Sequence, residues 1–467
     1  MKLKFLGATR EVTGSKFLLT TKSGKKILLD CGMFQGKGLE TDGMNRNLGF
    51  DPATIDHIIL SHAHIDHSGL IPYVYKLGFR GSVVCTNATR DLCAIMLADS
   101  GHIQEGDVKW FNKRRVAKGL SPVEPIYTEK DARACMELFI GVPYSRKFRI
   151  DENIQVKFTN TGHMLGSGVV SLEITENGKT TRIAYTGDIG RPVNRILKKP
   201  QPFPQCDYLI TESTYGNRQH PPMQDAEAEL LRVIRETCVE KGGKVIIPSF
   251  AIGRTQEVVY ALNNFFNEGL LPRINIYVDS PLAVNATEVF RMHADNLNEE
   301  VHDVMLNDPD PFGFSSLYYL KTPEESKKLN AVKKPCVIIS ASGMMEAGRI
   351  KHHAANNIEN PDNTMLFVGY CSPITLGARI LGGENPVSIF GEKHPVNATI
   401  ERIEAFSGHG DYSEMSQYLK CQDANKLKQV FLVHGEYEAQ QFYQQKLGEA
   451  GFTNVLIPEP GDEVTLT

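Results

Sequence analysis

The sequence predicts an α/β protein with two differently built parts. Residues 1–30 hold three short apolar strands, LKFL, SKFLLTT and KKILLD, separated by turns at Gly14 and Gly24, a pattern typical of an antiparallel sheet. From about Thr214 strands alternate with helices, and this alternation predicts a parallel, doubly wound sheet in a separate domain. Near its C-terminal end the chain returns to the first style of structure.

Two elements of the first part carry clear local signals. The segment VVSLEITENGKTTRIAYTGDIG predicts a hairpin with a tight turn at Asn177-Gly178. Thr128 followed by Asp131 predicts a helix start of the capping-box type, with aspartate in place of the usual glutamate.

The composition is that of an ordinary globular protein, long enough for two or three domains: 467 residues, 41% hydrophobic and 23% charged. MKLKFLGATR has no apolar run of signal-peptide length, and no later segment approaches the roughly 18 continuous apolar residues of a membrane span, so we expect a cytoplasmic protein. The nine cysteines contain no CxxC pair and are expected to be reduced core residues. A net charge of −4 means that a polyanionic substrate would need a local cationic groove and bound metals.

The run IILSHAHIDHSGL carries the strongest chemical signal in the chain. Its apolar start, Ile58 to Leu60, indicates the end of a buried strand, and a strand-to-helix turn would gather the polar side chains after it. These side chains are His62, His64, Asp66 and His67. Imidazoles and a carboxylate suit zinc, manganese or iron, and so many ligands together exceed the needs of one tetrahedral ion. The spacing therefore predicts two adjacent metals rather than a solvated polar loop.

Two more ligand candidates follow apolar strands. His163 in TGHMLGS and Asp188 in YTGDIG each lie where a strand meets a glycine-flanked loop, and together with the first cluster they supply histidines for one metal and an aspartate able to bridge two. Asp30 closes the third strand near the histidine loop. It fits two roles equally well, a carboxylate that orients a ligating imidazole and a turn-forming aspartate before glycine.

The C-terminal section supplies two further histidines. His434 in VFLVHGE repeats the arrangement of IILSH, an apolar strand that delivers a histidine, and it would give the second metal a ligand from a distant part of the chain. His409 in AFSGHGDY lies in a loop before a helix.

Three loops of the strand-helix region lie at the carboxyl ends of strands, where doubly wound sheets bind ligands. Free amides and arginines there would bind phosphate, although tight-turn chemistry explains each loop taken alone. The candidate substrate-binding residues are Arg254, Thr255, Ser340, Ser342, Arg349 and Arg379.

A long helix is expected from Thr89 to about Lys118, and it includes KWFNKRRVAK with the only tryptophan, Trp110. Base stacking and phosphate contacts use these residue types, so an RNA-facing patch is one interpretation. A solvated helix face is the other, and the sequence favours it.

Asp30, the motif HAHIDH, His163 and Asp188 together resemble the metallo-β-lactamase superfamily. Glu212 in ITESTYG, with the histidines of SGHGDY and VHGE, looks like the extra motifs of its β-CASP nucleic-acid-processing branch. The phrases PSFAIGRTQE, DSPLA and SASGMMEAGR strengthen the match, which covers nearly the whole chain. GYCSPITLGAR departs from it, because relatives usually have one more glycine before TLG.

The resemblance implies an αββα metallo-β-lactamase domain formed by residues 1–213 and 396–467. It also implies that a Rossmann-like α/β β-CASP domain, residues 214–395, is inserted between these two parts, and that the active site lies in the cleft between the two domains. It implies that the first zinc is held by His62, His64, His163 and Asp188. It implies that the second is held by Asp66, His67, His434 and the bridging Asp188. Asp30 would support these ligands.

The expected reaction is two-metal hydrolysis of RNA phosphodiester bonds in RNA processing or decay. We expect Asp66 to accept a proton from the attacking water, and His409, held by Glu212, to protonate the leaving oxygen. The expected enzyme is a metal-dependent hydrolase, a β-CASP endoribonuclease with 5′-exonuclease activity left open. Two Zn²⁺ ions are expected, with Mn²⁺ or Fe²⁺ as alternatives. RNA is the expected partner, no membrane is involved, and a homodimer is left open.

Three other functions compete with this one. A DNA nuclease of the same superfamily is disfavoured by His434, since the DNA-crosslink repair branch usually has an apolar residue there. A small-molecule ester or thioester hydrolase is disfavoured by the inserted domain, because a small substrate needs no second lobe. A non-catalytic RNA-binding scaffold is disfavoured because the sequence retains every ligand.

Overall fold

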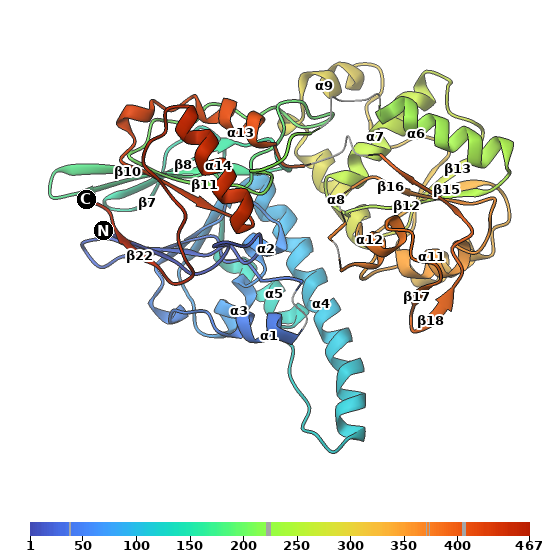
Figure 1. Ribbon diagram of the computed structural model, residues 1–467, viewed down its shortest axis with the longest axis horizontal. Helices are drawn as coiled ribbons and strands as arrows, with labels where there is room; N and C mark the ends of the chain where they lie inside the picture. The colour runs from blue at the N-terminus through green and yellow to red at the C-terminus, as the bar shows by residue number, and fades with distance from the viewer. Residues whose placement is uncertain (37–38, 221–225, 370, 373, 404–407) are drawn as a thin grey trace. The chain divides into compact units, whose positions relative to one another are not determined.

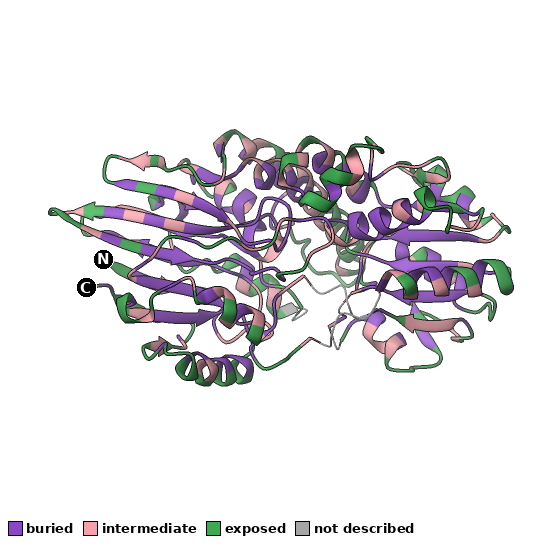
Figure 2. Ribbon diagram, turned by 90° about the horizontal axis from the view of Figure 1, so that it is seen from above, coloured by how far each residue is buried: buried purple, intermediate pink, exposed green. Residues whose placement is uncertain are grey.

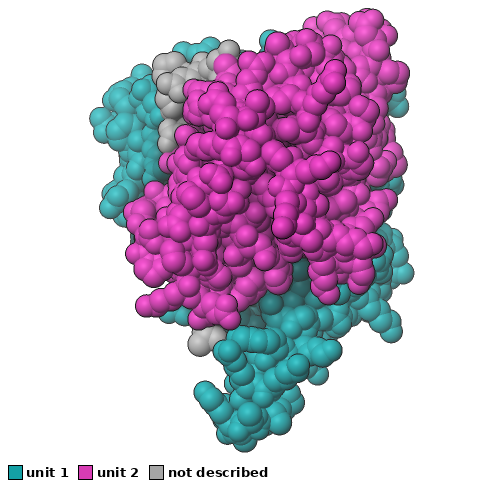
Figure 3. Space-filling view, turned by 90° about the vertical axis from the view of Figure 1, so that its right-hand side faces the viewer, with its two compact units in different colours: residues 1–219, 408–467 teal, residues 220–407 magenta. Residues whose placement is uncertain are grey.

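The computed structural model describes residues 1–36, 39–220, 226–369, 371–372, 374–403 and 408–467 (Figure 1). The chain forms two compact units, coloured separately in Figure 3. The first unit combines Met1–Gln219 with Gly408–Thr467, and the second is His220–Ser407.

The first unit contains two large sheets. The order of strands in the first sheet is β22 (Glu463–Thr465), β1 (Lys2–Phe5), β2 (Phe17–Thr20), β3 (Lys26–Leu29), β4 (His57–Ile59), β5 (Ser82–Thr86) and β6 (Phe139–Val142). Strands β1 to β3 pair antiparallel, which confirms the expected start of the chain. From β3 to β6 the pairing is parallel.

The order of strands in the second sheet is β21 (Val455–Leu456), β20 (Gln429–Val433), β11 (Tyr208–Glu212), β10 (Lys179–Tyr185), β9 (Gly168–Glu176), β8 (Ile154–Asn160) and β7 (Phe148–Asp151). Strands β9 and β10 form the expected hairpin, and Asn177 and Gly178 both have the positive φ angles of a tight turn, 52° and 72°. Strands β10, β11 and β20 are parallel neighbours. Their carboxyl ends therefore meet at one edge of the sheet.

The two sheets enclose a common apolar core. Rings from both sheets meet there, with Phe5 5.1 Å from Phe431 and Phe17 5.3 Å from Tyr185 between centroids. Alternation along β9 points Leu172 into this core, while Val169 lies on the opposite face of the sheet. Each fully buried side chain of this size contributes about 1.5–3 kcal/mol.

Helices cover the outer faces of both sheets and complete an αββα arrangement, as the sequence predicted. The helices associated with the first sheet are α1 (Leu39–Arg46), α2 (Ile65–Ser68), α3 (Ile71–Lys76), α4 (Asn87–Ala117) and α5 (Glu129–Cys135). Helix α5 begins with the predicted capping box of Thr128 and Asp131. The second sheet is covered by α13 (Tyr412–Leu419) and α14 (Tyr437–Glu449), whose residues Met415 and Tyr443 pack with Val169.

The second unit is built on a sheet in which every strand pair is parallel, which confirms the doubly wound prediction. The order of strands is β14 (Leu317–Tyr319), β13 (Asn275–Val278), β15 (Cys336–Ser340), β12 (Lys244–Pro248), β16 (Thr364–Phe367) and β19 (Thr399–Arg402). A short hairpin is formed by β17 (Val387–Ile389) and β18 (Glu392–His394). Figure 2 shows the central strands as buried, as expected where helices cover both faces.

The helices of the second unit are α6 (Ala226–Ile234), α7 (Arg254–Asn267), α8 (Pro281–Met292), α9 (Glu299–Met305), α10 (Pro323–Asn330), α11 (Ile350–Asn357) and α12 (Leu376–Leu381). Helix α6 continues as a π-helical segment over Arg235–Glu240. Within the described ranges of both units, no helix is long and apolar enough to cross a membrane.

Candidate metal centre

The histidine motif lies at the carboxyl end of β4. The buried strand places His62 just beyond its last residue, and α2 starts at Ile65, so Asp66 and His67 project from its first turn. His64 precedes that helix at its N-cap. The strand-to-helix turn expected from the sequence is therefore present, and it gathers these four side chains.

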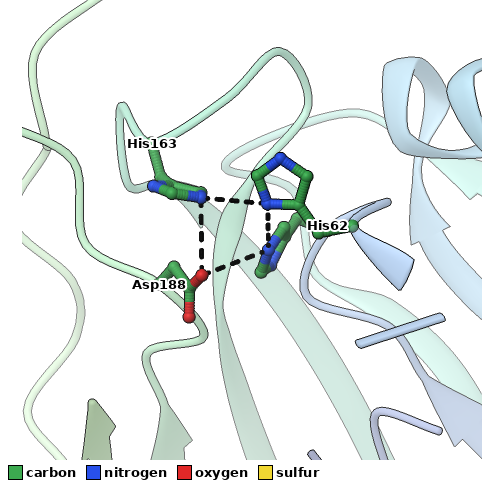
Figure 4. Close-up of side chains that lie close together, drawn as sticks. His62, His163 and Asp188 are labelled. Carbon is green, nitrogen blue, oxygen red and sulfur yellow. Dashed lines mark hydrogen bonds and ion pairs between the residues drawn. The ribbon is translucent and has the colours of Figure 1, made fainter. Parts of the chain in front are cut away.

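The second sheet delivers the remaining candidates to the same place. Asp188 follows β10, Glu212 ends β11 and His434 follows β20, so the three lie at the carboxyl ends of neighbouring parallel strands. His163 follows β8 in the same sheet. Figure 4 shows His62, His163 and Asp188 pointing towards one another from separate segments.

The first candidate metal site is the group His62, His64, His163 and Asp188, whose ligand atoms could hold one ion. Nε2 of His62 and Nε2 of His163 each lie 3.2 Å from Nδ1 of His64. The same two Nε2 atoms lie 3.5 and 3.4 Å from Oδ2 of Asp188. These atoms surround one point in the way that ligands surround a single ion.

The second candidate metal site is the group Asp66, His67 and His434. Nε2 of His67 lies 3.2 Å from Nε2 of His434, which in turn lies 3.3 Å from Oδ2 of Asp66. Oδ1 of Asp188 lies 3.2 Å from Nε2 of His67, while Oδ2 of the same carboxylate belongs to the first site. Asp188 is thus placed to bridge the two sites.

Two observations show that these residues fit a pair of metal ions. Metal–nitrogen bonds of about 2.0–2.1 Å at a tetrahedral angle would separate their nitrogens by about 3.3–3.4 Å, close to the 3.2 Å between His62 and His64. In addition, Oδ1 of Asp188 is buried and accepts no hydrogen bond from the described residues. Burying a carboxylate oxygen without a hydrogen-bond partner costs free energy, because the oxygen loses its contacts with water. A bound cation would offset this cost.

Three of the candidate ligand imidazoles are oriented through their other nitrogen. Nδ1 of His67 lies 2.6 Å from Oδ2 of Asp30, which also accepts hydrogen bonds from the hydroxyls of Ser61 and Tyr185, each at 2.7 Å. Asp30 therefore has the role of an orienting carboxylate in this geometry, in addition to its place in a turn. Tyr185 was not singled out from the sequence, although a buried tyrosine at the end of a core strand usually needs a hydrogen-bond partner.

The rings of His163 and His434 are held by loops. Nδ1 of His163 lies 3.0 Å from the carbonyl oxygen of Gly408, and Nδ1 of His434 lies 3.0 Å from Oγ1 of Thr214. Asp30 and His434 themselves have positive φ angles of 57° and 50°. A non-glycine residue in this conformation costs about 1–3 kcal/mol, which the surrounding contacts must offset.

Burial sets the charge state of the first site. Burial, reinforced by neighbouring imidazoles, lowers the pKa of His62 and His163, and it lowers the pKa of His64 to about 3. These rings are therefore neutral, the form that binds a metal. Burial alone would raise the pKa of Asp188, but the facing imidazoles of His434 and His67 hold it well below its ordinary value.

His409 and Glu212 form a pair beside the two sites. Nδ1 of His409 lies 3.3 Å from Oε2 of Glu212 and 3.9 Å from Oδ2 of Asp188. Glu212 is fully buried, and its Oε1 accepts a hydrogen bond of 2.5 Å from the amide of Ile189. Burial lowers the pKa of His409, but the charge and hydrogen bond of Glu212, together with the charges of Asp188 and Asp66, outweigh burial and raise this pKa to about 9. The pair thus places a protonated imidazole next to the metal ligands.

The candidate substrate-binding residues lie in the second unit, in internal bonds. Arg254 pairs with Glu257, and Nη1 of Arg349 lies 2.6 Å from Oδ1 of Asp279. Thr255 and Ser340 are buried, and their hydroxyls donate to the carbonyls of Phe250 and Asp279, respectively. The hydroxyl of Ser342 donates to the carbonyl of Ala347. Arg379 is partly exposed and pairs with Glu384. Contact of these six with RNA stays a prediction. Tyr370 and Pro373 of the departing motif GYCSPITLGAR lie outside the described residues.

Sequence reasoning missed one buried cluster in the second unit. Asp279 of DSPLA accepts hydrogen bonds from Ser326 at 2.5 Å and Arg349 at 2.6 Å, and its Oδ2 lies 2.6 Å from Nε2 of His353. The cluster joins DSPLA to the end of SASGMMEAGR, two phrases that the sequence shows as separate. No local pattern reveals this, because β13 and β15 become neighbours only in the folded sheet.

Three family models match the chain. Residues 11–248 match the metallo-beta-lactamase superfamily, residues 255–380 match the Beta-Casp domain, and residues 393–458 match the Zn-dependent metallo-hydrolase RNA specificity domain. The fold, the ligand cluster and these matches define a metal-dependent hydrolase of the metallo-β-lactamase superfamily. Within that superfamily the chain belongs to the β-CASP family, as the sequence motifs predicted.

Several relatives are similar over almost the whole chain. "Ribonuclease TTHA0252" of Thermus thermophilus is 34% identical over 438 residues, covering 94% of each chain. "RNase J-like protein" of Methanocaldococcus jannaschii is 35% identical over 437 residues, covering 93% of this chain and 92% of the relative. "Transcription termination factor FttA" of Methanosarcina mazei is 31% identical over 454 residues, covering 94% of this chain and 67% of the relative.

A solved structure shares the fold. The crystal structure of a protein of unknown function from Enterococcus faecalis aligns with 100% of this chain and 99% of its own, with a TM-score of 0.56 and 14% sequence identity. This likeness concerns the fold alone.

Proposed function

We propose that this protein is a zinc-dependent ribonuclease that hydrolyses RNA phosphodiester bonds in RNA processing or decay. The observation that carries the proposal is the ligand cluster of two metal sites joined by Asp188, with the His409–Glu212 pair beside it. Support for RNA as the substrate comes from the match to the RNA specificity domain and from relatives named as ribonucleases.

In this proposal the ligands are assigned as the family resemblance implies. His62, His64, His163 and Asp188 would hold the first ion, and Asp66, His67, His434 and Asp188 the second. Two such ions, when bound, supply a water that is acidic near neutral pH and neutralise charge on the phosphate. Nitrogen-rich sites with carboxylates suit Zn²⁺, with Mn²⁺ or Fe²⁺ as alternatives.

The chain's own residues move the protons. Asp66 is the proposed acceptor of a proton from the attacking water, because its carboxylate is the most exposed of the second site, at 19%. His409 is the proposed donor to the leaving oxygen, and Glu212 keeps its imidazole protonated and oriented. Arg254, Thr255, Ser340, Ser342, Arg349 and Arg379 of the second unit are the proposed contacts to RNA phosphates.

The test measures turnover on labelled RNA, matched DNA and a generic thioester, each with and without chelator. The proposal expects cleavage of RNA that chelation abolishes and zinc restores. Preferential cleavage of DNA would contradict it in favour of a DNA nuclease, and turnover of the thioester alone would favour a small-molecule hydrolase. Tight RNA binding without any turnover would make the protein a scaffold.

A further inference from the structure

The C-terminal half of helix α4 extends beyond the rest of the first unit (Figure 1). The N-terminal half packs on the fold through buried residues such as Leu92, Met96 and Leu97. Beyond Gly101 none of the described residues of α4 is buried, although the helix continues to Ala117. The outer half is therefore not held by burial of its side chains against its own unit.

The outer half of α4 has two different faces. At the helical spacing of about 100° per residue, five exposed side chains occupy one half of the circumference. We call this set the arm face, and it consists of Lys109, Trp110, Lys113, Arg114 and Lys118. Asn112 and Arg115 lie on the other side and are only partly exposed, and the exposed apolar residues Phe111 and Val116 lie there too.

The second side of the helix binds the returning chain and keeps the arm in one conformation. The side-chain amide of Asn112 donates to the carbonyl of Val123 at 2.8 Å and accepts from its amide at 2.9 Å. Nε of Arg115 donates to the carbonyl of Ser121 at 2.8 Å. The left-handed Gly119, with φ of 71°, turns the chain back. A ligand on the arm face would therefore meet a preformed surface and lose little affinity to ordering.

The arm face is strongly positive in a chain whose net charge is −4. Between Val108 and Val123 the sequence has only basic charged residues, and within the described part of the chain none of them forms an ion pair. Asp107, one turn earlier, marks the end of this region. Solvated helix faces usually mix both signs of charge, as PEESKKLN of α10 does.

An aromatic ring lies in the middle of these cations. Trp110 is 56% exposed, and the guanidinium of Arg114 lies 3.8 Å from the centre of its ring. An acidic peptide would satisfy the charges and leave the indole without a role. Single-stranded RNA would use both features, because phosphates bind the cations and bases stack on the indole and guanidinium planes.

We propose that the arm face binds single-stranded RNA at a distance from the metal centre. The start of helix α4 contacts the loop that carries His163, because the hydroxyls of Thr86 and Thr89 donate to the carbonyl of Gly166 at 2.7 and 2.9 Å. Lys109 lies about 33 Å further along the helix at 1.5 Å per residue. A stacked strand at about 3.4 Å per nucleotide needs about ten nucleotides to cover that length. The arm face thus selects long RNA over short RNA, an inference that rests on the proposed ribonuclease function.

Cleavage kinetics of the metal-loaded enzyme test this length dependence. The test variant is K109Q/K113Q/K118Q, and its charge-matched control is K22Q/K179Q/K420Q at exposed lysines elsewhere on the same unit. The substrates are an RNA of about 40 nucleotides and one of about six, too short to span. In the test variant, KM for the long RNA should rise about tenfold at low salt. The slope of log affinity for the long RNA against log salt concentration should also fall by about two, because three lysines no longer contact phosphates. The kcat of the test variant, and its KM for the short RNA, should not change.

Two kinetic outcomes would overturn the proposal. One is an unchanged KM for the long RNA in the test variant, and the other is an equal rise for both RNA lengths or in the control variant. If the unaltered enzyme cleaves neither RNA, the proposed function fails, and the binding measurement that follows still decides the role of the arm face.

The fluorescence of the single tryptophan reports on the arm face directly. Stopped-flow mixing of the metal-loaded enzyme with a uridine oligonucleotide of about 40 nucleotides should quench Trp110 as bases stack on it, and high salt should abolish the quenching. Unchanged fluorescence at saturating RNA would overturn the proposal. So would a fluorescence change that depends on protein concentration without RNA, because it would make the arm an interface between copies of this chain.

Discussion

Replacing His409 by alanine separates protonation of the leaving oxygen from metal binding. Its Nδ1 is held 3.3 Å from Glu212 and its ring lies beside His163, but it belongs to neither ligand group of the two metal sites. His409→Ala should therefore retain the metals and RNA binding while losing about 10²–10⁴-fold in the rate of cleavage. At about 1.36 kcal/mol per tenfold, this is about 3–5 kcal/mol of transition-state stabilisation.

Glu212→Gln tests the same pair from the other side. The substituted amide keeps an oxygen that can accept from the amide of Ile189, so the strand end should fold as before. Loss of the negative charge should lower the rate to a similar degree, and the double mutant should be little worse than either single one, because the two residues act as a unit.

The assay is single-turnover cleavage of labelled RNA, with metal content measured on the same preparations. His102→Ala is the matched control, because this histidine is 77% exposed and lies on α4 away from the ligands. Loss of metal in His409→Ala would remove the proton-donor role from the account. Full additivity of His409→Ala with Glu212→Gln would do the same.

Three further changes test the rest of the centre and the second unit. His434→Ala should lower metal content and cleavage together, and cleavage lost at full metal content would remove it from the second site. Tyr185→Phe deletes a 2.7 Å hydrogen bond to Asp30 and should weaken metal affinity about 10–100-fold in a chelator competition, whereas unchanged affinity would mean that the hydroxyl does not support the ligands. Asp279→Ala leaves the guanidinium of Arg349 without its carboxylate and should destabilise the second unit by about 3–5 kcal/mol in urea unfolding. Unfolding identical to the parent protein would show that the cluster contributes nothing.

Local patterns in the sequence predicted the antiparallel start of the chain, the parallel sheet of the second unit and the residues of the candidate site, whereas the αββα arrangement was implied by the family resemblance. Apolar strands such as those before His62 and His434 end in ligand residues, and parallel strands bring their carboxyl ends to one edge. The alternation after Thr214 likewise predicted the parallel sheet of the second unit.

Other features depend on which strands become neighbours, and no local pattern contains that information. The hydrogen bond from Tyr185 to Asp30 joins the two sheets of the first unit, and the ion pair of Arg349 with Asp279 joins segments about 70 residues apart. The positive φ of His434 is also set by tertiary contacts, because its amide donates to the carbonyl of Ala8 at 2.7 Å.

The central claim is a pair of metal ions bridged by Asp188, and metal analysis of an active preparation tests it most directly. The seven ligand residues are too many for one tetrahedral ion, so the protein should contain close to two metal equivalents per chain. Asp188→Ala should lower the content of both sites and abolish cleavage. One equivalent in a fully active preparation, or full metal content and activity in Asp188→Ala, would contradict the account.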